Sequence, residues 1–122
     1  MLAELATLAG SHPVWLRSAP DARALALKQA LRAVFEQAGW VIREDGIVDF
    51  PIKPGVFVFS ADLQPPQFVT VARRALEAAR LAVTAGVGFR AYVAQMKRRD
   101  PRYRGFELGP EQSYVVVIGR QP

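Results

Sequence analysis

The chain has 122 residues, which suits a single domain over 1–122 because domains cluster at about 100–150 residues. Hydrophobic residues make up 51% and charged residues 22%, a globular rather than a disordered composition. There is no cysteine, which excludes disulfides, thiolate zinc sites and cysteine nucleophiles and suits a reducing, cytoplasmic compartment.

The first half of the chain predicts helix, strand, helix and strand in turn. Residues 2–8 carry leucines spaced for one face of a short helix, and residues 13–18 alternate as a strand does. A long helix is expected over 18–39, where Ser18 and Asp21 have capping-box spacing and Gly39 suits the C-terminal end. On its outer face we expect Lys28, Arg32 and Glu36. Residues 40–44 form a short second strand.

The second half predicts a strand, a helix and a final strand. Residues 56–61 and 113–119 are apolar on both faces, as buried central strands are. Between them, residues 65–86 carry a helical apolar stripe that Gly86 ends. Residues 88–96 are ambiguous between strand and helix.

This β-α-β-β-α-β order fits two fold classes. One is an α/β three-layer sandwich with a mostly parallel sheet of four to five strands, in which the N-terminal helix covers the second face. The other is the ferredoxin-like α+β fold, with both helices on one face. We favour the sandwich, because the central strands do not alternate as strands with one solvated face would.

Polar residues follow several of the predicted strands. In an open parallel sheet, ligands bind beyond the carboxyl ends of the strands. We therefore expect a polar ligand site on one rim there, although helix capping alone also accounts for Asp21. Its members follow the first, third and last strands: Ser18, Asp21, Ser60, Asp62, Gln64 and Arg120.

Known cofactor and catalytic motifs are lacking. Prolines at 20, 65 and 66 remove backbone donors from both helix openings, and neither the dinucleotide fingerprint nor the P-loop is found, so we predict no cofactor. No metal site is predicted either. The single histidine, His12, is expected to be structural or solvated, which leaves no Ser-His-Asp triad. A carboxylate pair of Asp21 and Asp62 could support hydrolysis or glycosyl transfer if the two strand ends are adjacent.

The formal net charge of +5 is concentrated in residues 97–104, which carry +4 of it. Cations beside rings suit single-stranded nucleic acid, where phosphates and bases are both bound. Asp100 and Pro101 mark a turn, so the cations are expected on a loop rather than on one helix face. An anionic membrane surface, an acidic protein partner and a plain solvated loop remain alternatives. The binding residues would be Lys97, Arg98, Arg99, Arg102, Tyr103 and Arg104.

Both ends of the chain carry a family resemblance. Residues 2–40, "LAELATLAGSHPVWLRSAPDARALALKQALRAVFEQAGW", resemble the start of a soluble α/β domain in many small bacterial membrane-tethered proteins. The ending "VVVIGRQP" (115–122) is similar to the terminal strand of that domain. The resemblance implies a cytosolic domain tethered by a preceding membrane segment, with no established function and no functional residue to carry over.

Together these patterns predict a non-catalytic recognition module that binds a small polar ligand or a protein partner. A homodimer is also compatible with the sequence. The alternatives are single-stranded nucleic-acid binding through residues 97–104 and an enzyme that uses Asp21 and Asp62.

Overall fold

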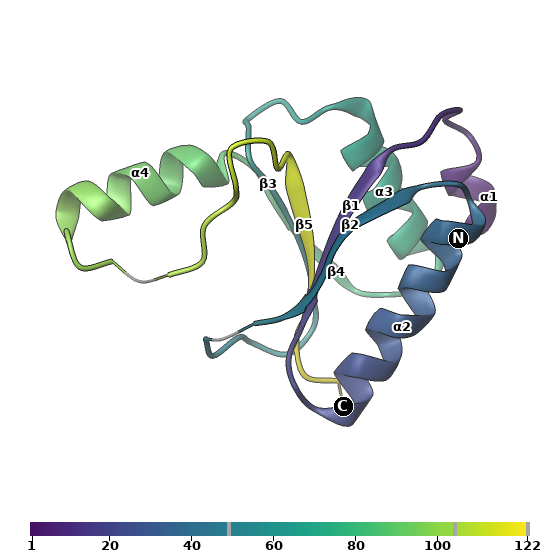
Figure 1. Cartoon of the computed structure of the whole chain (residues 1–122), viewed down its shortest axis with the longest axis horizontal. Coiled ribbons are helices and arrows are strands. Elements are labelled where there is room, and N and C mark those ends of the chain that lie inside the picture. The colour runs from purple at the N-terminus through teal and green to yellow at the C-terminus, as the bar shows by residue number, and fades with distance from the viewer. Residues whose placement is uncertain (49, 104, 122) are drawn as a thin grey trace.

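The computed structural model describes residues 1–48, 50–103 and 105–121. Along these residues helices and strands alternate (Figure 1). In chain order they are α1 (Leu2–Leu5), β1 (Pro13–Ser18), α2 (Ala22–Gln37), β2 (Val41–Ile47), β3 (Val56–Ser60), α3 (Gln67–Ala78), β4 (Val83–Gly86), α4 (Phe89–Arg99) and β5 (Tyr114–Ile118).

Helix α2 begins and ends at residues suited to those positions. The Asp21 carboxylate accepts a hydrogen bond from the Ala24 N–H at 3.1 Å, so Asp21 is the N-cap. Past the C-cap residue Ala38, Gly39 adopts a left-handed φ of +84°, as predicted. Ser18 remains the last residue of β1, so the expected capping box with Ser18 as the cap is wrong.

All five strands lie in one sheet, in the order β2-β1-β5-β3-β4. Helix α2 connects the parallel pair β1 and β2, and α3 connects the parallel pair β3 and β4. Strand β5 lies between the two units, parallel to β1 and antiparallel to β3. The two β-α-β units therefore run in opposite directions, and β5, which is buried along its whole length, joins them.

Helices lie on both sides of this sheet (Figure 1). Helices α1, α2 and α3 share one side and enclose the main core, whereas α4 lies on the other side and points away from the sheet. The α/β class and the mostly parallel sheet are confirmed. The expectation that the N-terminal helix covers the second face is wrong, because α1 packs against α2 and α3.

The helix expected over 65–86 is shorter than predicted. Helix α3 ends at Ala78, and Arg80 then adopts a left-handed φ of +64°, which turns the chain out of the helix. The following residues form β4, which pairs with β3. Gly86 is thus the last residue of a strand and not a helix end. The ambiguous residues 88–96 lie in α4.

Lys28 differs from its expected place on the outer face of α2. Its side chain is 4% exposed and its ammonium donates to the Gly46 carbonyl oxygen at 2.7 Å. The same ammonium pairs with Asp45 at 2.9 Å. Arg32 and Glu36 do lie towards solvent, where they form an i,i+4 ion pair of 3.1 Å. Lys28 therefore ties α2 to β2 from within the fold.

Among the described residues, no helix combines the length and the apolar character needed to cross a membrane.

Candidate functional site

The polar rim predicted from the strand ends is divided between two edges of the sheet. Ser18 pairs with Ile118 at the end of β5, whereas Ser60 pairs with Tyr114 at its start. Since β1 and β3 run in opposite directions, their carboxyl ends cannot lie together. One edge carries Ser18, Asp21 and Arg120, and the opposite edge carries Ser60, Asp62 and Gln64. The single-rim prediction is wrong because it assumed that β1 and β3 are parallel.

Several of these rim residues are buried or already hydrogen-bonded within the fold, which does not suit ligand binding. Ser18 and Ser60 are 0% and 3% exposed. Asp21 caps α2, and it lies at the other edge of the sheet from Asp62. The acid–base pair of Asp21 and Asp62 therefore has no shared site.

His12 is a packing residue. Its ring stacks on Phe68 with centroids 5.4 Å apart and meets Trp40 edge-on at 5.1 Å. Its Nε2 lies 3.0 Å from the Ala9 carbonyl oxygen. These contacts hold the segment that leads into β1, so His12 has a structural role, one of the two alternatives predicted for it.

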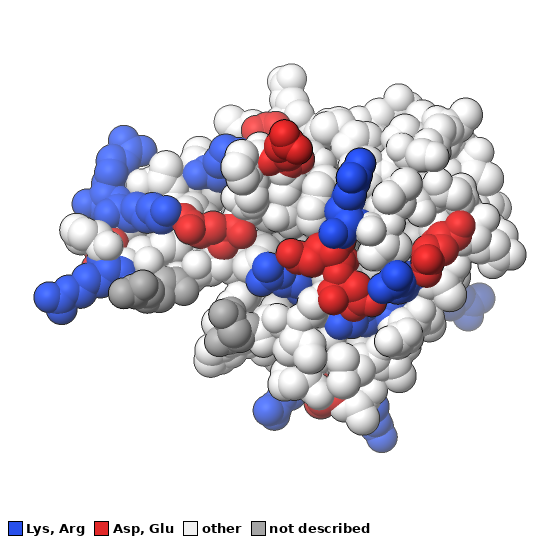
Figure 2. Space-filling model, in the orientation of Figure 1, with Lys and Arg blue, Asp and Glu red and all other residues white. Residues whose placement is uncertain are grey.

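The basic segment is partly helical, contrary to the expectation of a loop. Lys97, Arg98 and Arg99 form the last turn of α4, where cations interact favourably with the helix dipole. Lys97 pairs with Glu107, and Arg102 follows in the turn after the helix. Arg104 lies outside the described residues. Figure 2 shows the cations gathered at the far end of α4, while charges of both signs mix over the body.

A surface formed by a cluster of aromatic side chains lies between the sheet and α4. We call this surface the aromatic groove, a cavity of about 310 Å³ on the side of the sheet away from α1, α2 and α3. It contains one cation, Lys53, and its wall is otherwise mainly apolar. The rings that line it are Phe50, Phe57, Phe59, Phe89, Tyr92, Tyr103 and Phe106.

Stacking between neighbours holds these rings in place. The Phe57 and Phe59 rings stack at 5.7 Å and 17°, and Phe59 stacks on Phe89 at 5.5 Å and 25°. Phe106 lies 6.0 Å from Phe89 and 5.8 Å from Phe50. Tyr92 is 49% exposed at the opening. The stacked phenylalanine rings therefore form an ordered wall of the groove, and Tyr92 is accessible to solvent.

Polar contacts hold the chain that returns from α4 over the sheet. The Arg90 guanidinium donates to the carbonyl oxygens of Gly109 at 3.3 Å and Gln112 at 3.0 Å. The Arg17 guanidinium lies 4.7 Å from the centre of the Phe106 ring, a cation–π contact. Tyr103 folds over Gly105, and burial, together with the nearby Tyr92 and Glu107, raises its pKa.

Sequence reasoning missed the groove, although part of the signal was present. Phe57 and Phe59 alternate with valines, so one face of β3 is entirely aromatic. Phe89 and Tyr92 have i,i+3 spacing on α4. What could not be seen is that a strand and a projecting helix bring these pairs together.

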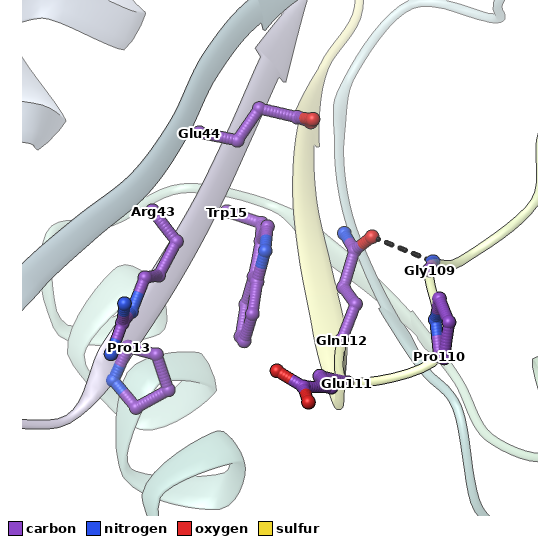
Figure 3. A pocket seen from close by; sticks show the side chains of 8 residues that line it. All are labelled: Pro13, Trp15, Arg43, Glu44, Gly109, Pro110, Glu111 and Gln112. Carbon is purple, nitrogen blue, oxygen red and sulfur yellow. Dashed lines mark hydrogen bonds between the residues drawn. The ribbon is translucent and has the colours of Figure 1, made fainter.

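A second cavity, of about 690 Å³, shares no lining residue with the aromatic groove. Trp15 of β1 stands at its centre, between Arg43 and Glu44 of β2 and the turn before β5 (Figure 3). We call it the tryptophan pocket, after Pro13, Trp15, Arg43, Glu44, Gly109, Pro110, Glu111 and Gln112, which line it.

A scan against protein-family models and searches of curated proteins and of solved structures found no match to this chain.

Proposed function

We propose that this chain is a non-catalytic recognition module that binds a protein partner in the aromatic groove. The observation that carries the proposal is the groove itself, an apolar cavity with seven rings in its wall. Buried aromatic anchors supply most of the binding energy at protein interfaces, and exposed apolar surface of this kind marks such interfaces.

The charges around the groove define the partner further. Lys53 lines the groove, and Arg98 and Arg99 lie in the last turn of α4, the helix that contributes Phe89 and Tyr92 to the groove wall. An exposed carboxylate on a ligand gains from such cations, mainly through orientation and association rate. The partner we propose is therefore a peptide segment with one bulky apolar or aromatic side chain beside several acidic residues.

Single-stranded nucleic acid fits the groove less well. Bases bind by stacking on free ring faces, about 1–3 kcal/mol for each base. Here Phe59 already stacks on both Phe57 and Phe89, with interplanar angles of 17° and 25°. These faces are occupied within the protein, so the groove suits an inserted side chain better than a row of bases.

Titration of the ¹⁵N-labelled chain with a short acetylated peptide tests the proposal. The probe holds one tryptophan flanked by aspartates, and two control peptides replace the tryptophan by serine or the aspartates by lysines. We expect amide shifts at Phe57, Phe59 and Phe89 with the probe and much weaker binding of both controls. An absence of shifts at the groove, or equal binding of the controls, would overturn the proposal.

Two substitutions test the roles of the ring and the cations. Tyr92→Ala removes an exposed ring and should cost about 1–2 kcal/mol, a five- to thirtyfold loss of affinity for the probe. Val41→Ala, at the far edge of the sheet, is the matched control and should change nothing. The pair Arg98→Gln and Arg99→Gln should weaken binding in low salt, whereas Arg74→Gln on α3 should not. Preferential binding of single-stranded oligothymidylate, lost steeply with salt, would replace the protein partner by nucleic acid.

A further inference from the structure

The tryptophan pocket is a second site, independent of the proposed function. It lies where β1 begins, between the edge strand β2 and the turn before β5. Its volume of about 690 Å³ falls within the usual range of about 300–1,000 Å³ for small-molecule sites.

Hydrogen bonds fix the wall of the pocket formed by the turn. The Gly109 N–H donates to the Gln112 side-chain oxygen at 3.1 Å, and the Gln112 amide donates to the Tyr114 carbonyl at 3.2 Å. Gln112 is 8% exposed, so this turn is built into the fold. Arg90 holds the same turn from α4 through two backbone carbonyls. A ligand would therefore meet a wall that is already ordered.

Packing against a neighbouring ring also fixes the indole of Trp15. It packs edge-on against Tyr114, with ring centroids 5.9 Å apart and an interplanar angle of 83°. The Tyr114 hydroxyl donates to the Pro13 carbonyl oxygen at 2.9 Å, which fixes that ring in turn. Trp15 itself is half-buried and borders the cavity, so an apolar group can pack against it without rearrangement.

Of the charged side chains that line the pocket, one already forms an ion pair with another described residue and two do not. Glu44 is bound to Arg17 by two contacts, at 2.6 and 3.3 Å. Within the part of the chain that the structure describes, the side chains of Arg43 and Glu111 have neither an ion pair nor a hydrogen bond. Figure 3 shows Arg43 on one side of Trp15 and Glu111 on the other. A cation and a carboxylate thus flank an indole, and both are open to a ligand.

We propose that the tryptophan pocket binds a free α-amino acid with an apolar or aromatic side chain. Its carboxylate pairs with the Arg43 guanidinium, its ammonium pairs with the Glu111 carboxylate, and its side chain packs on Trp15. A ligand with one charge satisfies only one of the two side chains, so the pocket prefers a small molecule that carries both charges.

The two tryptophans provide the assay. In a ¹H–¹⁵N spectrum of the full chain, the Trp15 indole signal should shift with added L-phenylalanine. The Trp40 signal serves as an internal control, because Trp40 is 3% exposed and belongs to the main core. Phenethylamine, which lacks the carboxylate, and 3-phenylpropionate, which lacks the ammonium, should each bind about fivefold more weakly.

Variants that remove one charge test which side chain binds the carboxylate of the ligand and which binds its ammonium. Arg43→Gln should weaken L-phenylalanine about fivefold and leave phenethylamine unchanged, whereas Glu111→Gln should leave 3-phenylpropionate unchanged. Arg74→Gln on α3 is the matched control, and preserved signal dispersion shows that each variant is folded. The proposal is overturned if L-phenylalanine at 10 mM leaves the Trp15 signal in place, if the singly charged analogues bind equally well, or if neither variant weakens binding.

Discussion

Lys28 provides a direct test of how α2 is attached to the sheet. In Lys28→Met the side-chain volume is nearly kept, but the Gly46 carbonyl and the Asp45 carboxylate lose the ammonium that binds them at 2.7 and 2.9 Å. An acceptor left unpaired in the interior costs about 1–3 kcal/mol. The lost ion pair adds about 1 kcal/mol, because the Asp45 side chain is 18% exposed and keeps its contact with Arg32 at 2.7 Å. We expect a total loss of about 2–4 kcal/mol, or about 8–15 °C in Tm for a domain of this size.

Urea unfolding at neutral pH measures this loss, with Arg32→Gln as the control at the half-exposed end of the same network. The Arg32→Gln control should lower the free energy of unfolding by less than about 1 kcal/mol.

The pH dependence of stability provides a second measurement. Hydrogen bonding from Lys28 is the main cause that lowers the pKa of Asp45, so the stabilisation is present above the unfolded pKa of about 3.9 and is lost as the pH falls through the folded pKa. The variant should lose less stability on acidification. Equal stability of Lys28→Met and the parent chain at pH 7 would refute this reasoning.

Three further substitutions test backbone and core contacts. Arg80→Gly should stabilise the fold by about 0.5–1 kcal/mol in urea, because Arg80 has a φ of +64° that glycine adopts without strain. Gly119→Ala should abolish cooperative thermal unfolding, since its Cβ would overlap the Lys53 carbonyl oxygen; a folded variant would contradict this. Tyr114→Phe should cost about 1–2 kcal/mol through the lost bond to Pro13. Burial raises the pKa of Tyr114, so the parent should also lose stability above about pH 10, where the unfolded chain ionises, and the variant should lose less; equal alkaline slopes would contradict this.

The elements that the sequence predicts correctly are those whose pattern depends on near neighbours. The apolar run of β5 indicates a strand buried on both faces, and the structure buries all of Tyr114–Ile118. Gly39 marks the end of α2 because a left-handed residue there favours glycine. Lys28 could have been placed correctly too, since Ala24 and Leu31, four residues before and three after it, lie on the same buried stripe.

Strand direction and long-range pairing are not encoded in local patterns. Nothing in the residues of β3 indicates that it runs against β5, yet this single fact separates Ser18 from Ser60 and divides the predicted rim. Strand β4 has four residues and follows directly on a helical stripe, so its spacing looked like one more helical turn. The aromatic groove combines β3, α4 and two connecting segments, which only the tertiary fold brings together.

The groove follows from how this fold covers its sheet. Helices α1, α2 and α3 lie on one face of the sheet. On the other face Val115 and Val117 are fully buried against residues of the connecting segments, whereas Phe57 and Phe59 are only half-buried. Helix α4 points away from the sheet, and the residues it contributes to the groove are Phe89 and Tyr92. Each 100 Å² of apolar surface left open on this face forgoes about 2.5 kcal/mol of burial. Under the proposed function, a partner whose bulky side chain packs on the half-buried rings would regain part of that free energy.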